Sequence, residues 1–579
     1  MRMRHGLDRG WLWGALWVAT LGAGAQAATP NWTMQVWGQG VVADGAPSKA
    51  CPDYPGAVPY LFTVKAAPAG TGAELIVPGV LQPGHAYQFS FAVMAPKAPV
   101  ALDAFFRKDG PYYDAGVIRT VQVTDRWQRV TLRGVHASMG LGSVRLALRN
   151  LGTAVCVAAP QIAEIAEQDV GGEAKLQAVS PHFFGVHLNK LGRHVQWPDY
   201  EPDVVRLWAA GTEWNNVQPS KDAIDWRRNP HAQRLEFLSK FVISRGRRSE
   251  LIMTLGMTPR WAGRKAPVGA CGGTGFGEGS CLPPEDMDTW RAFVRNVAAR
   301  YKERIKIWEI WNESDVPQHW SGDIKDLVEL TKVASEEIRR VAPRAIVIGP
   351  NFTSLGLRAM HEFLLAGGGQ HVDGLSIHAY MPRSPGINGA VIRNLRESLG
   401  YMGLADKLIW NTESNTSCGA TAPEDLGMSR NPCVLSPSEA IAQTYLLQAS
   451  MGVQNISFYT WEGAEQEYGG SALVQADYET PTEAGQTMRA LTDLLRGASV
   501  REIKPASPGV AMVEVVREQK VCRAAWSLSE RNVALVDPTL KKWELMRSWP
   551  RNKPVATDEQ GGGKVGAWPI VWCKSGADL

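Results

Sequence analysis

The 579-residue chain has almost no excess of charge of either sign. Lysine and arginine together number 61, aspartate and glutamate number 57, and the basic residues form no dense run. A nucleic-acid-binding surface needs concentrated positive charge, so the electrostatic footprint of a nucleic-acid binder is missing. The composition, with 45% hydrophobic and 20% charged residues, is that of a globular protein with a large core, which argues against wholesale disorder.

The motifs of several other chemistries are also absent. The chain has no Cys-x2-Cys pair and no histidine at ligand spacing from a cysteine, so no metal site is predicted. No G-x-G-x-x-G turn follows the first strand of the predicted strand-helix region, which argues against a dinucleotide cofactor. A secreted esterase would need a G-x-S-x-G turn, and none is present. We therefore expect no cofactor.

The first 27 residues are expected to form a secretory signal peptide. Three arginines precede an apolar run over residues 11–25, and Ala25-Gln26-Ala27 has the small-x-small form of a cleavage site. The run is shorter than the ~20 residues that cross a bilayer, although a retained anchor is the alternative. No later segment has 18 uninterrupted apolar residues. The prediction is a periplasmic or secreted protein that is a monomer and has no stable membrane insertion.

Eight cysteines, an even number that all lie beyond residue 27, agree with an exported protein. Eight cysteines allow 105 connectivities, so we choose among them by predicted domain. The pairs expected in this way are Cys51 with Cys156, Cys271 with Cys281, Cys418 with Cys433, and Cys522 with Cys573.

Residues 28–168 alternate apolar and polar side chains in short runs, such as 87–93, 127–132 and 144–148. Period-two alternation interrupted by Gly, Pro and Asp is typical of an antiparallel β-sandwich. The first two runs resemble strands of the jelly-roll carbohydrate-binding modules that precede many polysaccharide-degrading enzymes. That resemblance implies a carbohydrate-binding-module-like domain, and no acidic cluster indicates a calcium ion in it.

Residues 178–497 alternate short apolar strands with amphipathic helices. Strands are expected at 183–188, 204–208, 251–255, 305–311, 345–348, 374–378, 407–410 and 456–459, and helices include 287–301, 324–341, 390–401 and 439–452. Eight strands separated by helices predict an α/β fold, a (β/α)8 TIM barrel, with a doubly wound open sheet as the alternative. Alternation returns over 498–579, which predicts a small C-terminal β-sandwich.

The fourth and seventh predicted strands each end in an acidic motif. Asn312-Glu313 follows the fourth strand, and Glu413 follows the seventh. The carboxyl ends of barrel strands carry the chemistry in this fold, so both carboxylates are expected at one mouth. Two such carboxylates are what glycosidic cleavage requires, since one protonates the leaving oxygen and the other attacks the anomeric carbon.

These motifs resemble the clan A retaining glycoside hydrolases, most closely family 39, which contains β-xylosidases and exopolysaccharide endoglycosidases. The resemblance also includes Gly349-Pro350, His378-Ala379-Tyr380 and Trp461-Glu462 at three further strand ends. It implies that Glu313 is the general acid/base, Glu413 the nucleophile and Asn312 a ligand of the substrate 2-hydroxyl. One departure is Ser314, where many family members have proline.

Further substrate-site residues are expected around the two glutamates. An ionised Glu413 needs donors, for which Arg206 and Tyr380 are the candidates, and Glu313 needs apolar surroundings that raise its pKa. His187 and His378 are candidates for binding sugar hydroxyls, with a backbone-bonded role as the alternative for each. Tryptophan is abundant, at 22 residues, and indole rings pack on sugar faces. The stacking candidates are Trp214, Trp261, Trp320 and Trp461, with core packing as the alternative for each.

Together these observations predict a secreted retaining glycoside hydrolase that cleaves a polysaccharide. The family resemblance and the aromatic-rich loops favour a β-linked substrate and the endo mode. A bacterial exopolysaccharide is one candidate substrate. The alternative from a different class is a non-catalytic glycan-binding or exopolysaccharide-export component that retains the barrel shape, because a fold does not establish an activity.

Overall fold

The structure is a computed structural model. It describes residues 32–575 apart from 68–71, 83–84, 109–116, 137–140, 150, 167–168, 171–174, 189–196, 247, 266–270, 272–274, 355, 381–384, 417–434, 462–471, 506, 508, 529–531, 547–548 and 550–561. The expected signal peptide and the expected bridge between Cys418 and Cys433 lie outside the described residues.

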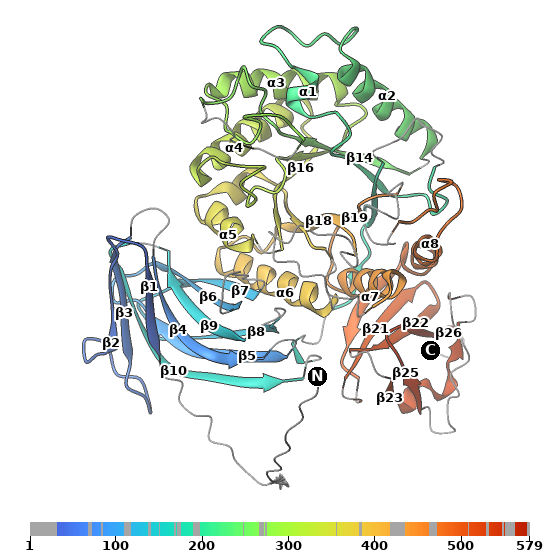
Figure 1. Ribbon diagram of the computed structural model, residues 1–579. Coiled ribbons are helices and arrows are strands. Elements are labelled where there is room, and N and C mark those ends of the chain that lie inside the picture. Colours follow the sequence, from blue (N-terminus) through green and yellow to red (C-terminus); the bar gives the residue numbers. More distant parts are fainter. Residues whose placement is uncertain are drawn as a thin grey trace, which may run out of the picture.

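Eight parallel strands in the middle of the chain close into a barrel. Figure 1 shows this barrel beside the two flanking sheet regions. They are β12 (Phe184–His187), β13 (Val204–Leu207), β14 (Glu250–Leu255), β15 (Ile307–Ile310), β16 (Ile346–Thr353), β17 (Gly374–His378), β18 (Leu408–Ser414) and β19 (Ile456–Phe458). The predicted (β/α)8 barrel is confirmed, and every strand overlaps a range expected from the sequence. The open-sheet alternative is wrong because β19 pairs with β12 and closes the ring.

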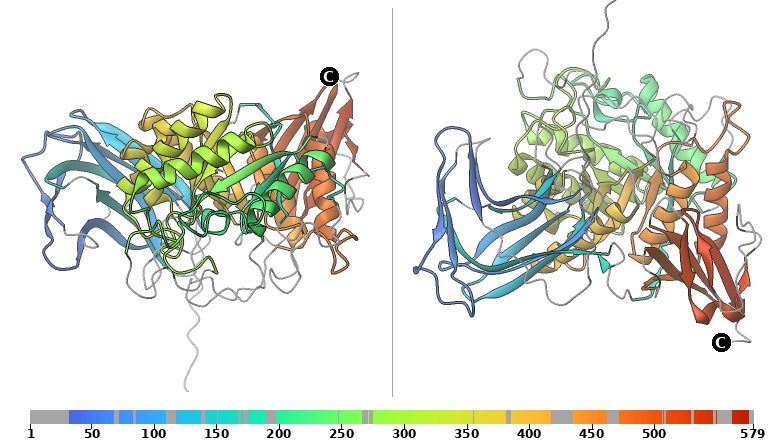
Figure 2. Two further views of the ribbon diagram at one scale, coloured as in Figure 1. Left: turned by 90° about the horizontal axis from the view of Figure 1, so that it is seen from above. Right: turned by 60° about the horizontal axis from the view of Figure 1, so that its bottom comes forward.

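Helices cover the outside of the barrel (Figure 2). They are α1 (Trp214–Val217), α2 (Pro230–Arg245), α3 (Met287–Tyr301), α4 (Ile324–Val341), α5 (Leu357–Leu365), α6 (Pro385–Tyr401), α7 (Pro437–Ser450) and α8 (Glu483–Leu495), with a short 3-10 helix, η2 (Gly368–His371). Local sequence explains their starts. At α7, Ser436 and Glu439 form a reciprocal capping box and Pro437 occupies the first turn.

The barrel interior changes from apolar to polar along its strands. Near the amino ends, one layer is apolar: Val204, Ile252, Ile307, Ile348 and Trp410. Side chains two residues apart on a strand point to the same face. Two residues further along their strands come Arg206, Thr254, Glu309 and Thr412, which together with Ser376 of β17 are almost fully buried. An apolar layer therefore fills the amino end of the barrel, and a buried polar layer lies between it and the carboxyl ends of the strands.

The N-terminal part forms two five-stranded sheets, ordered β1-β4-β9-β6-β7 and β2-β3-β10-β5-β8. The strands are β1 (Thr33–Trp37), β2 (Val42–Pro47), β3 (Tyr60–Ala66), β4 (Gly72–Leu81), β5 (Ala86–Met94), β6 (Val100–Lys108), β7 (Val117–Val123), β8 (Gln128–Val135), β9 (Gly142–Leu148) and β10 (Thr153–Ile165). All pairs are antiparallel, and the inward-facing aliphatic and aromatic residues form one core. The predicted N-terminal sandwich is confirmed.

This sandwich packs directly against the barrel, beside α5 and α6 in Figure 1. The backbone N–H of Thr120 donates to Ser398 Oγ at 3.2 Å, and Asn394 donates to the Arg133 carbonyl at 2.8 Å. Arg149 binds the buried Asp103 at 2.7 Å and the Arg358 carbonyl at 3.1 Å. One face of the sandwich is thus occupied by barrel helices.

The C-terminal part is a six-stranded sheet, ordered β11-β20-β21-β22-β26-β24, with a two-stranded ribbon, β23-β25. The strands are β11 (Gln177–Ala178), β20 (Ser499–Ile503), β21 (Val510–Arg517), β22 (Lys520–Ser527), β23 (Val533–Val536), β24 (Glu544–Leu545), β25 (Gly562–Val565) and β26 (Ile570–Ser575), and a 3-10 helix, η4 (Pro538–Lys542), follows β23. Strand β11 precedes the barrel in the chain, so this sheet joins both flanks of the barrel region.

Three of the four expected disulfides are present: Cys51–Cys156, Cys271–Cys281 and Cys522–Cys573. The third joins directly opposed residues of β22 and β26. None of the helices in the described part of the chain combines the length and the apolar character that a membrane crossing needs.

Candidate active site

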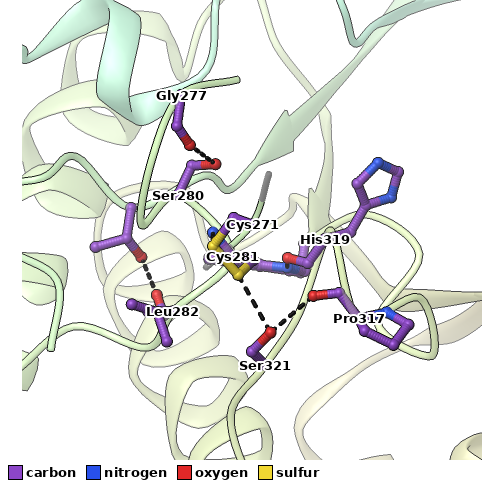
Figure 3. The surroundings of a disulfide bond; sticks show 10 residues. Cys271, Gly277, Ser280, Cys281, Leu282, Pro317, His319 and Ser321 are labelled. Carbon is purple, nitrogen blue, oxygen red and sulfur yellow. Dashed lines mark hydrogen bonds between the residues drawn. A yellow bond between two sulfur atoms is a disulfide. The ribbon is translucent and has the colours of Figure 1, made fainter. Parts of the chain in front are cut away.

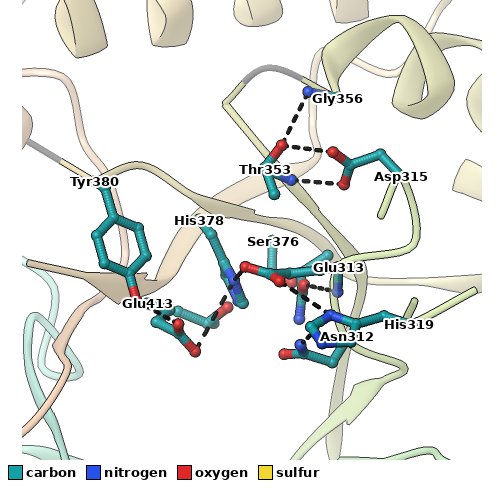
Figure 4. A network of polar contacts seen from close by, with 12 residues as sticks. Asn312, Glu313, Asp315, His319, Thr353, Gly356, Ser376, His378, Tyr380 and Glu413 are labelled. Carbon is teal, nitrogen blue, oxygen red and sulfur yellow. Dashed lines mark hydrogen bonds and ion pairs between the residues drawn. The ribbon is translucent and has the colours of Figure 1, made fainter. Parts of the chain in front are cut away.

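Glu313 and Glu413 meet at the mouth of the barrel (Figure 4). Glu413 lies near the end of β18 and Glu313 three residues beyond β15. One oxygen of each carboxylate and one ring nitrogen of His378 all lie within 4.8 Å of one another. Two strand ends that are far apart in the sequence therefore bring two acids to one point, as the sequence predicts.

Arg206 of β13 joins the residues beneath the mouth. Its guanidinium donates to Glu309 at 2.7 Å, to Glu413 at 2.9 Å and to Asn312 Oδ1 at 2.8 Å. The arginine is fully buried. The planar fork of an arginine suits several fixed acceptors at once, so this side chain sets the positions of the acid and the amide together.

Glu309 is a buried member of this network that sequence reasoning missed. It accepts hydrogen bonds from the hydroxyls of Thr254, Ser376 and Thr412, each at 2.7 Å. Burial alone would raise its pKa, but the charge of Arg206 and these donors hold the pKa below its usual value. The available signal was an acid inside the apolar strand that runs from Ile307 to Ile310, where an unpaired charge is costly.

The phenol of Tyr380 donates to Glu413 Oε1 at 2.6 Å. Burial, and then the neighbouring Glu413, raise the pKa of Tyr380 well above its ordinary value. The phenol therefore keeps its proton and remains a donor. Arg206 and Tyr380, both predicted as partners of Glu413, each bind a different oxygen of its carboxylate.

Glu313 lies between two imidazoles. His378 Nδ1 is 2.9 Å from one carboxylate oxygen, and His319 Nδ1 is 3.0 Å from the other. Burial raises the pKa of Glu313, but hydrogen bonds and charge from the two histidines outweigh it and lower the pKa. The prediction that apolar surroundings raise the pKa of Glu313 is therefore wrong, because an imidazole ring contacts each oxygen of its carboxylate.

The backbone around Glu313 is held in an uncommon conformation. Trp311 and Glu313 have φ angles of 62° and 43°, in the left-handed region that costs energy for residues other than glycine. Asn351 fixes this segment, since its amide accepts from the Glu313 N–H at 2.5 Å and donates to the Trp311 carbonyl at 3.2 Å. Asp315 binds Thr353 and ties the same loop to β16 (Figure 4).

The two predicted histidines have different environments. His187 is fully buried, and its Nε2 donates to the Thr412 carbonyl at 3.1 Å, so the backbone-bonded alternative holds for it. Burial, then the charge of Arg206, lower its pKa well below the usual value, which keeps the ring neutral. His378 contacts Glu313 directly, and its buried Nε2 has no partner among the described residues.

The tryptophans are mostly core residues. Trp214 is fully buried and packs on Trp290 and Phe293, so its predicted stacking on a sugar is wrong: no ring face is left for one. Trp320 and Trp461 are 5% and 2% exposed, and Trp261 is half-buried against Trp214. The indole nitrogens of Trp320 and Trp461 are buried and have no hydrogen-bond partner in the described part of the chain.

The spacing of Glu313, His378 and Glu413 would suit a cation geometrically. However, the Arg206 guanidinium lies 2.9 Å from Glu413 and Tyr380 binds the other oxygen of that carboxylate. A fixed positive charge at this distance repels a metal ion. The fixed charge of Arg206 therefore disfavours a metal ion at this cluster.

Comparisons with known proteins agree with the fold. No protein-family model and no curated protein matches the chain. A solved family 39 glycoside hydrolase from Bacteroides cellulosilyticus WH2 aligns over 82% of this chain and 95% of its own, with 16% identity and a TM-score of 0.50. This likeness shows a shared fold, a barrel with flanking sheets.

Two further solved structures are similar at lower TM-scores. A monomeric β-xylosidase from Caulobacter crescentus CB15 is 17% identical over 65% of this chain and 80% of its own, with a TM-score of 0.46. A family 30 endoxylanase from Clostridium papyrosolvens C71 is 11% identical over 70% of this chain and 98% of its own, with a TM-score of 0.47.

Proposed function

We propose that this protein is an exported retaining glycoside hydrolase, with Glu413 as nucleophile and Glu313 as general acid/base. The observation that carries the proposal is the approach of the two carboxylates, with one oxygen of each within 4.8 Å of the other. Retaining enzymes hold these groups about 5–5.5 Å apart, whereas inverting enzymes need about 6.5–9.5 Å to admit water between them. The spacing favours the retaining mechanism.

In the first step a Glu413 oxygen attacks the anomeric carbon while Glu313 protonates the departing glycosidic oxygen. Arg206 and Tyr380 orient the Glu413 carboxylate and stabilise its ionised form. Asn312 is oriented by the same arginine, so its NH2 group points away from the guanidinium and suits a sugar hydroxyl. The step forms a glycosyl ester on Glu413.

In the second step Glu313, now a carboxylate, removes a proton from water, and the water oxygen attacks the anomeric carbon. The Glu413–sugar bond breaks and the product keeps its original anomeric configuration. Each glutamate thus returns to its starting state, and the chemistry needs no cofactor beyond the two acids.

The substrate class proposed is a β-linked polysaccharide cleaved internally, and the location proposed is the periplasm or the exterior. The motifs around Glu313 and Glu413 resemble those of family 39 glycoside hydrolases, which include β-xylosidases, and this resemblance makes a β-linked polymer the first one to test. The three disulfides and the N-terminal apolar run support export.

The test uses Glu413→Gln and Glu313→Gln variants, assayed separately on a panel of polysaccharides. A panel of 2-deoxy-2-fluoroglycosides, followed by peptide mapping of the wild-type protein, should trap a covalent ester on Glu413 and identify the sugar. Glu413→Gln is expected to lose about 10⁴-fold or more in kcat, as removal of a nucleophile does in other enzymes, and Glu313→Gln about 10²–10⁴-fold, the usual contribution of acid–base assistance.

The binding-protein alternative makes the opposite prediction. If no polysaccharide is cleaved while glycan binding persists in wild type and in both variants, the chain is a non-catalytic glycan-binding or export component. If cleavage occurs but no fluoroglycoside labels Glu413, the retaining mechanism is wrong and the hydrolase proposal alone remains.

A further inference from the structure

His319 is a polar residue at the site that has no assigned role. It lies in the loop between β15 and α4, six residues after Glu313. Its Nδ1 is 3.0 Å from Glu313 Oε2 and 3.3 Å from the Asn312 amide nitrogen. Figure 4 shows the three side chains side by side. A histidine in this loop therefore contacts the candidate acid/base directly.

Several independent contacts hold His319 in this position. Its carbonyl accepts from the Trp311 indole at 2.9 Å, and its ring packs edge-on against Trp208 and Phe276. Phe276 belongs to the loop closed by the Cys271–Cys281 disulfide, and Figure 3 shows this bridge beside the His319 loop. These contacts fix the imidazole, so Nδ1 faces Glu313 with no further loss of conformational entropy in each catalytic cycle.

The proposed chemistry requires a proton on Glu313, which the carboxyl holds poorly between the two imidazoles. A general acid must carry a proton at the working pH, yet the two imidazoles lower the pKa of this carboxyl. The charged and titratable groups of the pair and its surroundings come from four elements or loops. They are Glu313 and Asp315 of the same loop, His378 of β17, Glu413 of β18 and, through Asn312, Arg206 of β13.

Of the two histidines, His319 is the one with a route to water. Its side chain is 17% exposed, whereas that of His378 is fully buried. The Asn312 amide also favours proton sharing, because its oxygen accepts from Arg206 and its NH2 group must face His319 Nδ1. A donor facing Nδ1 stabilises the state in which that nitrogen has a lone pair and the proton lies on Glu313.

We propose that His319 and Glu313 share the proton that is delivered to the leaving group. In the resting protein one proton lies on His319 Nδ1 or on Glu313 Oε2. When the glycosidic bond breaks, this proton passes from Glu313 to the departing oxygen. In the second step a proton from the attacking water returns to Glu313 and redistributes to His319, so no net proton is gained or lost. His319 acts through Glu313 and is thus a positioning residue.

The inference rests on the proposed glycosidase function, and its kinetic test uses aryl glycosides of the sugar that the wild-type protein accepts. His319→Asn keeps a polar group near the position of Nδ1 but cannot hold a proton. His85→Asn is the matched control, since it removes another histidine–glutamate contact of 2.8 Å, in the N-terminal sandwich.

His319→Asn should move the basic limb of the kcat/KM profile to lower pH, because Glu313 alone loses its proton earlier than the pair does. It should also slow a phenyl glycoside about tenfold or more while leaving a 2,4-dinitrophenyl glycoside nearly unchanged, since a good leaving group needs no acid. His85→Asn should change neither. A basic limb that stays in place or moves to higher pH overturns proton sharing, since loss of a merely positive neighbour moves it upward.

A second measurement needs no substrate and so separates this inference from the proposed function. In wild-type protein the Glu313 carboxyl ¹³C and the His319 Nδ1 ¹⁵N resonances should titrate with common midpoints, and Glu313→Gln should abolish the shared transition of His319. Independent titration of the two groups contradicts the inference, even if the protein proves to be a glycosidase. Common midpoints uphold the sharing of a proton between His319 and Glu313 even if no glycoside is cleaved, in which case only its delivery to a leaving group is overturned.

Discussion

At the scale of single residues, the site depends on one buried cation with three acceptors. Arg206 contacts Glu309, Glu413 and Asn312, and the first of these is as deeply buried as the arginine itself. Burying two charges has a large desolvation cost, which their attraction roughly offsets. The ion pair is therefore better explained as a device that orients the site than as a source of stability.

This argument predicts different effects on stability and activity. Arg206→Met should abolish activity and lower the free energy of unfolding by about 3–5 kcal/mol, because Glu309 is left buried without a countercharge. The double variant Arg206→Met/Glu309→Met should regain most of that stability in urea denaturation and stay inactive. A double variant as unstable as the single one would show that the ion pair itself stabilises the fold.

Residue roles were only partly predictable from sequence. Glu313 and Glu413 were recognisable because each follows an apolar strand at a barrel end. His319 and Asn351 were not, because their roles depend on side chains from other loops and on the left-handed backbone at Glu313. Trp214 was misassigned because a tryptophan just after a strand fits either a sugar or a core, and only packing distinguishes the two.

At the scale of elements, periodicity predicted the structure well. The helices α3 and α4 occupy the ranges expected from apolar spacing, and all eight barrel strands appear where predicted. Strand β11 was missed, since two residues are too few for an alternating pattern. It exists because Gln177 and Ala178 pair with Val500 and Ser499, a long-range contact that no local pattern encodes.

The α3–α4 pair yields a pH prediction. Glu337 of α4 binds Arg295 of α3 at 3.0 Å, and this hydrogen bond is the main cause that lowers the pKa of Glu337 from 4.5 to about 2. A carboxyl with a lowered folded-state pKa stabilises the fold above its unfolded value and loses that contribution as the pH falls. Between about pH 4.5 and pH 2, Glu337→Gln should therefore show a shallower loss of stability than wild type in thermal melts.

The control for this prediction is Glu336→Gln, a neighbour on α4 that is 52% exposed and lies 3.7 Å from Arg291. It should follow the wild-type acid profile. Parallel profiles for wild type and Glu337→Gln would contradict the assignment of acid sensitivity to this helix contact.

The Cys271–Cys281 loop predicts an effect on activity that exceeds its effect on stability. The bridge closes a loop of only 10 residues in sequence separation, so its entropic contribution is modest, about 3 kcal/mol at most. It nevertheless holds Phe276 against His319, and the Cys281 carbonyl accepts from the Ser321 N–H at 2.9 Å. Cys271→Ser/Cys281→Ser should lower kcat/KM several-fold while the melting temperature falls only slightly.

The comparison for the loop is Cys51→Ser/Cys156→Ser, which removes a bridge in the N-terminal sandwich, far along the chain from the barrel mouth. That variant should lose stability with unchanged kcat/KM in the folded protein. Equal kcat/KM losses in both double variants would point to a global effect of disulfide removal.

At the scale of the whole molecule, the three parts are packed together and not merely linked. The N-terminal sandwich binds α5 and α6 through buried polar groups, and the C-terminal sheet shares the barrel's core through Val500, Val513 and Trp526. Sequence alternation predicted the parts, but the interface between them involves residues some 200 to 280 positions apart, such as Arg149 and Arg358 or Thr120 and Ser398. No local sequence pattern predicts contacts between residues so far apart in the chain.

If the N-terminal sandwich is packed on the barrel and not merely tethered to it, the two parts should unfold together. Arg149 is 7% exposed and binds Asp103, which is fully buried, so Arg149→Ala leaves this carboxylate with Arg358, at the longer distance of 3.8 Å, as its countercharge and should cost about 3 kcal/mol at the interface. For a cooperative unit of this size that corresponds to a fall of roughly 3 °C in melting temperature. Calorimetry should show one transition, containing both sandwich and barrel, that shifts as a whole.

Arg129→Ala, which removes an exposed arginine bonded only within the sandwich, should shift this transition by less than about 1 °C. Two transitions, with the barrel transition unmoved, would mean that the sandwich melts as a separate unit and that its contacts with α5 and α6 are incidental to barrel stability.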